Sequence, residues 1–176
     1  MVILALVLAL LSADDFSLVW TDAGKAFSVQ FDSRIWQYTE NADSFSLTHN
    51  SLDGLEIKIT DRVTDPADST LSAIAQQTFN RSGERQAAAI ANEHELTSTE
   101  LKSLNAAEGY YCEGVYGPDV EPISVRVLVL KRSGRILIAE GLFPGTEKQN
   151  SYSWRKCSEA LNTVWQTISG VGKIKK

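Results

Sequence analysis

The chain has 176 residues, of which 43% are hydrophobic and 22% are charged, as is usual for a globular protein. This length is sufficient for one domain with a substantial core. The formal net charge of −5 argues against a nucleic-acid partner, because nucleic-acid-binding proteins usually carry a basic patch that neutralises phosphates.

The first thirteen residues predict an export signal. MVILALVLALL is uncharged and mostly aliphatic, and Ser12 and Ala13 follow it. As a helix this stretch covers roughly half of a hydrocarbon core about 30 Å thick, so it is too short for a stable span. Its length suits the hydrophobic part of a secretory signal, although no Lys or Arg precedes it. A buried first strand or helix and an uncleaved anchor are the alternatives. We therefore expect a signal at 1–13 and one domain at 14–170.

Short strands with tight turns are predicted for the first third of the domain. AFSVQF and LEIKIT alternate apolar and polar residues with the period of two of a half-buried strand. RIWQY and SFSLTH lie between them and have the same character. Asp53-Gly54 is a hairpin turn signal. These stretches together predict a meander of strands.

A helix is predicted after this meander, with Asp68 or Ser69 as its N-cap. Its apolar side recurs at helical spacing and consists of Leu71, Ile74, Ala75, Thr78 and Phe79. Gly83 interrupts the pattern. ERQAAAIANEHEL is expected to resume the helix and to fray before Glu93.

The second half of the domain predicts further strands and a final helix. HELTSTELKSL and GYYCEGVY have strand character. ISVRVLVLK and RILIAEGLF flank the turn Arg132-Ser133-Gly134, and both carry apolar residues at odd and even positions, as central strands covered on both faces do. Apolar residues from Trp154 to Ile168 recur every three or four positions, which predicts an amphipathic helix. We expect this helix to end at Gly170, in the left-handed conformation that closes many helices.

These elements predict an α+β protein with a mainly antiparallel sheet and helices on both of its faces. A parallel sheet needs a crossover connection, usually a helix, between strand pairs, and only two substantial helices are expected. Helices on both faces explain the doubly apolar central strands.

The two cysteines leave two alternatives open. Cys112 lies in a predicted strand, and Cys157 lies on the apolar side of the last helix. If that helix packs on that strand, an exported protein can form a disulfide between them. In a reducing compartment they are two buried thiols.

No pattern in the sequence predicts catalytic residues, a metal site or a cofactor. His49 and His94 stand apart from the cysteines and from any spaced ligand cluster. The remaining candidates for a partner surface are aromatic, since aromatic residues anchor many interfaces. Packing in the core is the alternative, because aromatic residues anchor cores as well. These candidates are Trp20, Trp36, Tyr38, Tyr110, Tyr111 and Tyr116.

The basic tail at 171–176 offers at most a peripheral contact with a membrane. Lys173, Lys175 and Lys176 follow two glycines, and a cluster of cations favours an anionic surface. A solvated chain end is the alternative explanation.

The order of elements over residues 24–169 resembles the PsbP-like fold family. The resemblance is carried by the hairpin AFSVQFDSRIWQY, the strand LEIKIT, the stretch TELKSLNAAEGYYCEGVY, the hairpin at SGRILIAEGLFP and the final helix ending LNTVWQTIS. The family includes the photosystem protein PsbP, DcrB-type bacterial lipoproteins and a Ran-binding nuclear factor. The resemblance implies a non-catalytic protein that binds partners or stabilises assemblies, with no shared catalytic residue to carry over.

The sequence therefore favours an exported, non-catalytic accessory or binding protein of the cell envelope that acts through a protein partner. A hydrolase whose site is assembled from distant residues is one alternative. A cytosolic protein-binding regulator, whose apolar start is a true strand, is the other.

Overall fold

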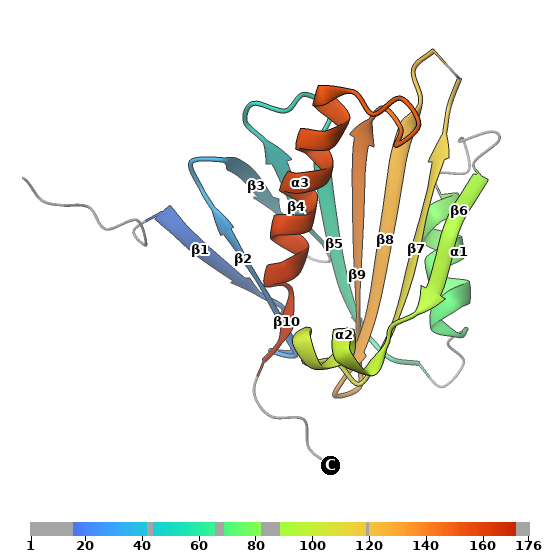
Figure 1. Ribbon diagram of the computed structural model, residues 1–176. Coiled ribbons are helices and arrows are strands. Elements are labelled where there is room, and N and C mark those ends of the chain that lie inside the picture. The colour runs from blue at the N-terminus through green and yellow to red at the C-terminus, as the bar shows by residue number, and fades with distance from the viewer. Residues whose placement is uncertain (1–15, 42–43, 66–68, 82–88, 119, 172–176) are drawn as a thin grey trace, which may run out of the picture.

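The computed structural model describes residues 16–41, 44–65, 69–81, 89–118 and 120–171, which fold as Figure 1 shows. Within these ranges the chain forms ten strands and three helices. The strands are β1 (Ser17–Thr21), β2 (Phe27–Asp32), β3 (Trp36–Glu40), β4 (Ser44–His49), β5 (Glu56–Val63), β6 (Ala89–Glu95), β7 (Glu108–Tyr116), β8 (Ile123–Arg132), β9 (Arg135–Pro144) and β10 (Ser169–Gly170). The helices are α1 (Leu71–Arg81), α2 (Ser98–Ser103) and α3 (Tyr152–Thr167).

The strands form two antiparallel sheets, which confirms the prediction of an α+β chain with a mainly antiparallel sheet. The larger sheet has the order β3-β4-β5-β9-β8-β7-β6, and the smaller one has the order β1-β2-β10. The predicted β8–β9 hairpin is present, and its turn places Ser133 and Gly134 at φ values of 50° and 76°. Twist-matched hairpin turns need such left-handed residues.

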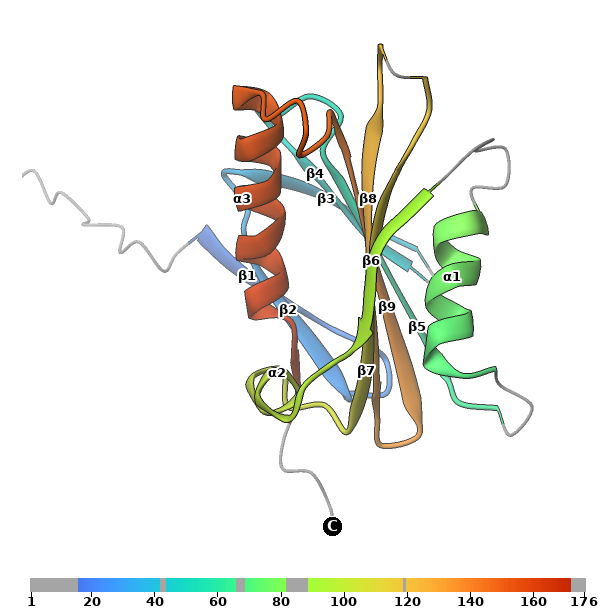
Figure 2. The same ribbon diagram turned by 45° about the vertical axis from the view of Figure 1, so that its right-hand side comes forward.

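Alternate residues of the central strands pack into two separate cores. In β8, Val125, Val127 and Val129 join a cluster with α1, whereas Leu128 and Leu130 join a larger cluster with α3 and β2. Figure 2 shows α1 on one side of the seven-stranded sheet and α3 with β1 and β2 on the other. The apolar pattern of β8 therefore follows from its contacts on two sides.

The structure corrects the predictions for residues 89–103. The stretch expected to resume the helix is β6, the edge strand that pairs with β7. The stretch expected as a strand contains α2, which begins at Thr97 with a capping box: the Thr97 and Glu100 side chains each accept from the other's backbone amide. Of the two predicted N-caps of α1, Asp68 lies outside the described residues. Ser69 is corrected, since the Thr70 hydroxyl accepts from the Ala73 amide at 3.3 Å.

The predicted final helix is present as α3, but its end differs from the prediction. The C-cap is Ile168 in an extended conformation, and Gly170 continues into β10 instead of closing the helix in the left-handed region. Gly170 has a packing reason instead: a Cβ there would lie 2.3 Å from the carbonyl oxygen of Asn105.

An ion cluster connects the two sheets. Arg135 at the start of β9 lies 3.0 Å from the Asp22 carboxylate, measured from Nε to Oδ2, and also pairs with Asp61 of β5. Asp22 is buried in the β1–β2 turn, where it accepts hydrogen bonds from the amides of Gly24 and Phe27. The small sheet is thereby fixed to the centre of the large one.

Candidate functional site

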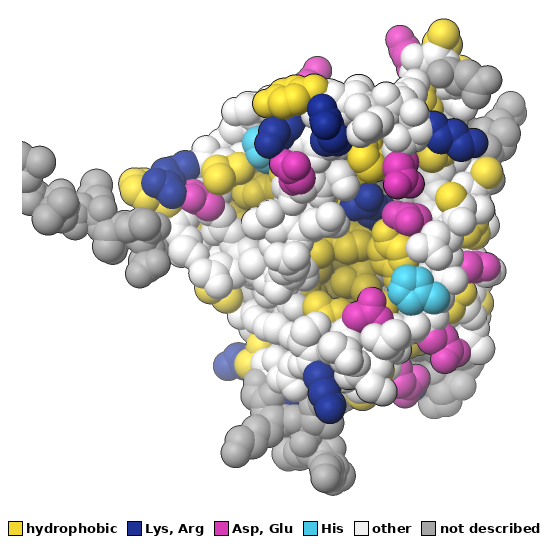
Figure 3. Space-filling model, viewed as in Figure 1, with side chains coloured by type: hydrophobic (Ala, Val, Ile, Leu, Met, Phe, Trp, Pro, Cys, Tyr) yellow, Lys and Arg dark blue, Asp and Glu magenta, His cyan; other side chains and the backbone are white. Residues whose placement is uncertain are grey.

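A strip of the large sheet lies open beside α3. The helix packs on β9 and β2. Beside it, on the same face of the sheet, β8, β7 and β6 follow, and the helix that packs on β7 and β8, α1, lies on the opposite face (Figure 2). Figure 3 shows a hollow of hydrophobic side chains there. We call this surface the open strip and define it by the partly buried Leu96, Leu101 and Tyr111, with the buried Leu128 and Trp165 of the larger core cluster beneath and beside them.

A chain of polar side chains crosses the strip from β7 to α3. The Tyr111 hydroxyl donates to Glu113 Oε2 at 2.5 Å, and Arg126 Nε donates to the same oxygen at 3.1 Å. Arg126 Nη1 donates to Asn162 Oδ1 at 3.0 Å, and the guanidinium lies 5.3 Å from the ring centroid of Phe143. Burial and the bond to Glu113 raise the pKa of Tyr111, so the phenol stays a donor at neutral pH.

The lower end of the strip holds a histidine and a carboxylate. His94 Nε2 lies 3.9 Å from Glu100 Oε1, and the His94 ring is 5.3 Å from the Tyr111 ring. Hydrogen bonds from the Thr97 hydroxyl and amide keep the pKa of the Glu100 carboxyl below its usual value. This end of the strip therefore carries a fixed negative charge.

The upper end of the strip opens into a cleft of about 630 Å³, between β6–β8 and the segment that leads into α3. The Trp154 indole forms part of its wall and donates to Ser124 Oγ at 3.1 Å. Arg126 and Glu113 line the cleft as well, so it meets the hollow at this ion pair. A volume of several hundred Å³ is in the range of ligand and peptide clefts.

Two of the six predicted aromatic residues come together at the other end of the sheet. Trp20 stacks on Phe45 with ring centroids 5.1 Å apart, and Tyr38 lies 6.0 Å from the same ring. Tyr38 is 52% exposed. Trp36 is buried in the core and meets His49 edge-on, so it is unsuited to a partner surface.

The three tyrosines of β7 are divided between the two faces of the sheet. Tyr110 and Tyr116 pack on the cluster with α1, and Tyr111 lies in the open strip. The six aromatic residues therefore do not form one surface. The period of two of a strand already separates Tyr110 from Tyr111, so the sequence contained the signal for this division.

Both cysteines are buried free thiols in the structure. Cys112 belongs to the cluster with α1 and Cys157 to the larger cluster with α3, so the two thiols lie on opposite faces of the sheet. The candidate disulfide between them is therefore corrected to the other alternative, two buried thiols. Burial raises the pKa of Cys112 to about 11 and also raises the pKa of Cys157.

The described residues hold no cluster of three or more His, Cys, Asp or Glu side chains arranged for a metal. His49 accepts hydrogen bonds from the amides of Ser51 and Leu52, which gives it a structural role. Within the described ranges, no helix is long and apolar enough to cross a membrane. The signal predicted at 1–13 and the lysines of the tail lie outside the described residues.

The polar residues of the strip were missed by sequence reasoning. Arg126 interrupts the otherwise apolar middle of β8, residues 125–130, and a charged residue in such a place needs a partner. That signal was present in the sequence, whereas the identity of its partners, Glu113 and Asn162, depends on strand pairing and helix position.

Comparison of the sequence with protein-family models gives no match, and comparison with curated proteins gives none either. Comparison of structures gives several. The chain is similar to the cyanobacterial PsbP (CyanoP) of Synechocystis, with a TM-score of 0.57 and 8% identity over 88% of this chain and 92% of that one.

Two further structures are more distant. Protein PA94 of Pseudomonas aeruginosa, whose function is unknown, has a TM-score of 0.49 and 10% identity over 86% of this chain and 94% of that one. LpqN of Mycobacterium tuberculosis, involved in cell envelope biogenesis, has a TM-score of 0.39 and 9% identity over 90% and 80%. The similarity to the Synechocystis protein concerns the fold alone, and it confirms the resemblance that the element order predicted: the chain has the PsbP-like fold.

Proposed function

We propose that the protein is an exported, non-catalytic accessory protein of the cell envelope that binds a protein partner through the open strip. Its scaffold is an α/β/α sandwich in which helices flank both faces of the sheet. The observation that carries the proposal is the strip itself: an apolar hollow, bordered by polar side chains, on a sheet face that α3 covers only in part.

The strip has the width of a helix. Neighbouring strands lie about 4.8 Å apart, so β8, β7 and β6 span roughly 10 Å, close to the diameter of an α-helix. Sheet faces in layered folds are normally covered by another element. An amphipathic helix of the partner, laid beside α3 with its apolar side toward Tyr111 and Leu128, supplies that cover.

The polar border of the strip favours recognition without rearrangement. Arg126 is held on two sides, by Glu113 and by Asn162, and its side chain is only 13% exposed. A partner therefore meets charges whose positions are already fixed, which lowers the ordering cost of binding. An apolar centre with a polar rim is also the usual anatomy of an interface.

Export is the second part of the proposal and rests on the sequence. MVILALVLALL has the length of a signal's hydrophobic region and is too short to span a bilayer. Intact mass of the protein from fractionated native cells tests this part. We expect it in the envelope fraction with a start near residue 14, and a cytosolic protein that retains Met1 contradicts export.

Site-specific photo-cross-linking in native cells tests the docking site. A photo-reactive residue is placed at His94 at the lower end of the strip, at Lys148 beside the upper cleft, and at the control position Lys58. Lys58 is an exposed strand residue whose neighbours Ile57 and Ile59 point into the larger core, so it faces the other side of the sheet.

We expect His94 and Lys148 to yield an adduct with the same partner, and Lys58 to yield none. The substitution Ala91→Arg fills the wall of the upper cleft and should remove both adducts. Adducts that form equally at Lys58, or that persist in A91R, contradict docking at the strip.

A further inference from the structure

A groove surrounds the N-terminal end of α1 and reaches the lower end of the open strip, since Leu96 and Leu101 line part of it. It consists of two cavities of about 510 and 360 Å³, and both are lined by Thr70, Leu71 and Glu108. Because they share these residues, they form one continuous depression, which we call the acidic groove. It lies between α1, the end of β6 and the start of β7.

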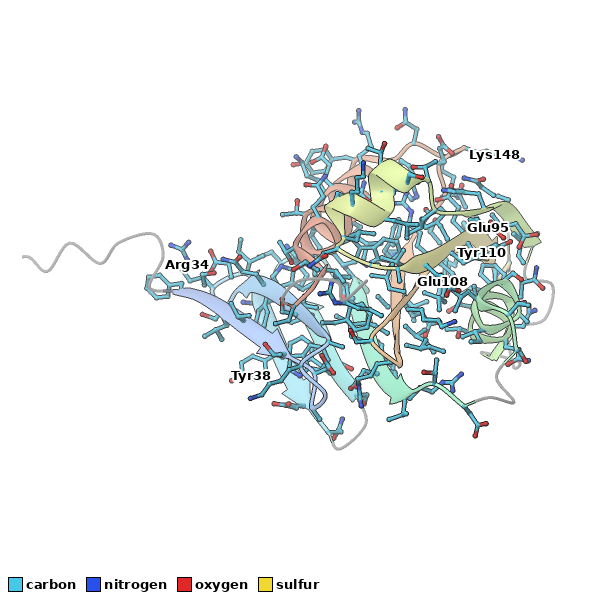
Figure 4. The ribbon with its side chains drawn as sticks, turned by 90° about the horizontal axis from the view of Figure 1, so that it is seen from below. Arg34, Tyr38, Glu95, Glu108, Tyr110 and Lys148 are labelled. Atoms are coloured by element: carbon cyan, nitrogen blue, oxygen red, sulfur yellow. The ribbon has the colours of Figure 1, made fainter. Side chains whose placement is uncertain are left out.

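The charged side chains that line the groove are mostly carboxylates. Asp65 lines the first cavity, Glu95 the second and Glu108 both. Lys131 is the only cation among the described lining residues, and its Nζ lies 3.0 Å from Glu108 Oε1. Figure 4 shows Glu95, Glu108 and Tyr110 as neighbours at this end of the molecule.

A further carboxylate extends the negative charge along β6. Glu93 lies two residues before Glu95, and the two face the α1 side with Tyr110, the cross-strand partner of Glu95. Burial, and then the neighbouring Glu93, raise the pKa of Tyr110. Residues two apart on a strand repeat about every 7 Å, which is also the spacing of alternate side chains in an extended peptide.

The floor beneath these carboxylates is apolar. Leu71 of α1 and the buried Ile136 of β9 line the first cavity, and Leu96 lines the second. Charged residues on an edge strand such as β6 are common because they prevent edge-to-edge association. That purpose does not require apolar cavities next to the charges, so the combination points to a ligand with apolar stems and cationic ends.

We propose that the acidic groove binds an extended basic segment of another protein, with Lys or Arg at alternate positions. The alkyl stems of these residues lie on Leu71, and their cationic ends reach Glu93 and Glu95, which are two apart on β6. The side chain of Glu108 is 57% exposed, so a further cation can share it with Lys131.

The groove meets the open strip at Leu96 and Leu101. The interaction still goes beyond the proposed function, because the carboxylates of Glu93 and Glu95 and the ring of His94 lie on opposite faces of the sheet.

Fluorescence anisotropy with a labelled synthetic peptide that alternates lysine and valine tests the proposal. A peptide that alternates glutamate and valine is the matched probe. We expect the lysine peptide to bind with an affinity that falls as ionic strength rises, and the glutamate peptide not to bind.

The double variant Glu95→Gln/Glu108→Gln should weaken binding of the lysine peptide about fivefold or more, since it removes two charge contacts. The matched control is Glu56→Gln/Glu159→Gln, which removes the same charge from an exposed site on β5 and one on α3. The control should bind as the unmodified protein does.

If both double variants bind the lysine peptide equally weakly, the peptide is attracted only by the net charge of the protein, and the proposal is wrong. It is also wrong if the lysine peptide does not bind the unmodified protein. Cross-linking from His94 and Lys148 reports the open strip separately. Loss of peptide binding in E95Q/E108Q with those adducts retained supports the groove as an independent surface.

Discussion

Tyr111 and Cys112 are neighbours in β7, yet they face opposite sides of the sheet and belong to different cores. Burial raises the pKa of both groups, because the charged form of each loses its hydration inside the protein. The two side chains differ in their partners. Tyr111 donates to Glu113, whereas the Cys112 thiol is enclosed by apolar residues.

The hydroxyl of Tyr111 stabilises the fold in a pH-dependent way. A hydrogen bond to a charged acceptor contributes about 1.5–3 kcal/mol, so Tyr111→Phe should lower the free energy of unfolding by that amount near neutral pH. Because the folded-state pKa is raised, this contribution is fully present below the unfolded pKa of about 10 and is lost as pH rises toward the folded value. Urea unfolding on either side of that pKa measures it. Y111F should therefore converge with the unmodified protein at alkaline pH, and a constant difference contradicts this account.

Both cysteines should be unreactive in the folded protein. A buried thiol whose pKa is raised holds little thiolate at neutral pH, and the thiolate is the reactive form. Titration with a thiol reagent, without reductant, should show no reaction for the native protein and two thiols after denaturation. If no thiol reacts after denaturation, the two cysteines form a disulfide, and their placement in two separate cores is wrong.

At the scale of elements, the strands of the meander, the β8–β9 hairpin and α3 could be predicted because their apolar periods are strong and local. Residues 89–103 could not be assigned from periodicity. AIANEHE has little strand character of its own and becomes β6 because β7 offers it a partner, a tertiary effect that overrides propensity. For α2 a local signal existed: Thr97 followed by Glu100 is a capping-box pattern.

The fit of α3 to β9 depends on one glycine. A Cβ at Gly141 would lie 2.6 Å from the side chain of Leu161. The helix can therefore pack this closely on β9 only because residue 141 has no side chain. Gly141→Ala should destabilise the protein by about 1–3 kcal/mol through overpacking. Leu161→Ala should cost about 2–5 kcal/mol through the cavity that it leaves.

The double variant G141A/L161A tests whether these costs share one contact. The new methyl group occupies part of the space that Leu161 leaves, so the combined loss should be smaller than the sum of the two single losses. Unfolding by urea, compared across the four proteins, gives the interaction energy. Strict additivity would show that the helix adjusts its position around Gly141.

At the scale of the whole molecule, the fold could be predicted from the order of elements, but the open strip could not. The strip exists because α3 and the small sheet together cover only part of one sheet face, and that depends on where β10 and the Asp22–Arg135 pair hold them. The aromatic candidates were scattered for the same reason. Sequence shows which residues are suited to an interface, and packing decides which of them remain accessible.

The Asp22–Arg135–Asp61 cluster should control how firmly the small sheet is held. Arg135→Met leaves Asp22, whose side chain is fully buried, without its cation, and breaking such a buried pair costs about 3–5 kcal/mol. Hydrogen exchange should rise in β1 and β2 more than in β7 and β8, because the loss begins where the cluster joins the two sheets. The control is Arg34→Met, which breaks the exposed Arg34–Asp32 pair of the same small sheet and should leave exchange nearly unchanged. Equal acceleration in β7 and β8 of R135M would show that the two sheets unfold as one unit, with the cluster stabilising the whole molecule and not the junction.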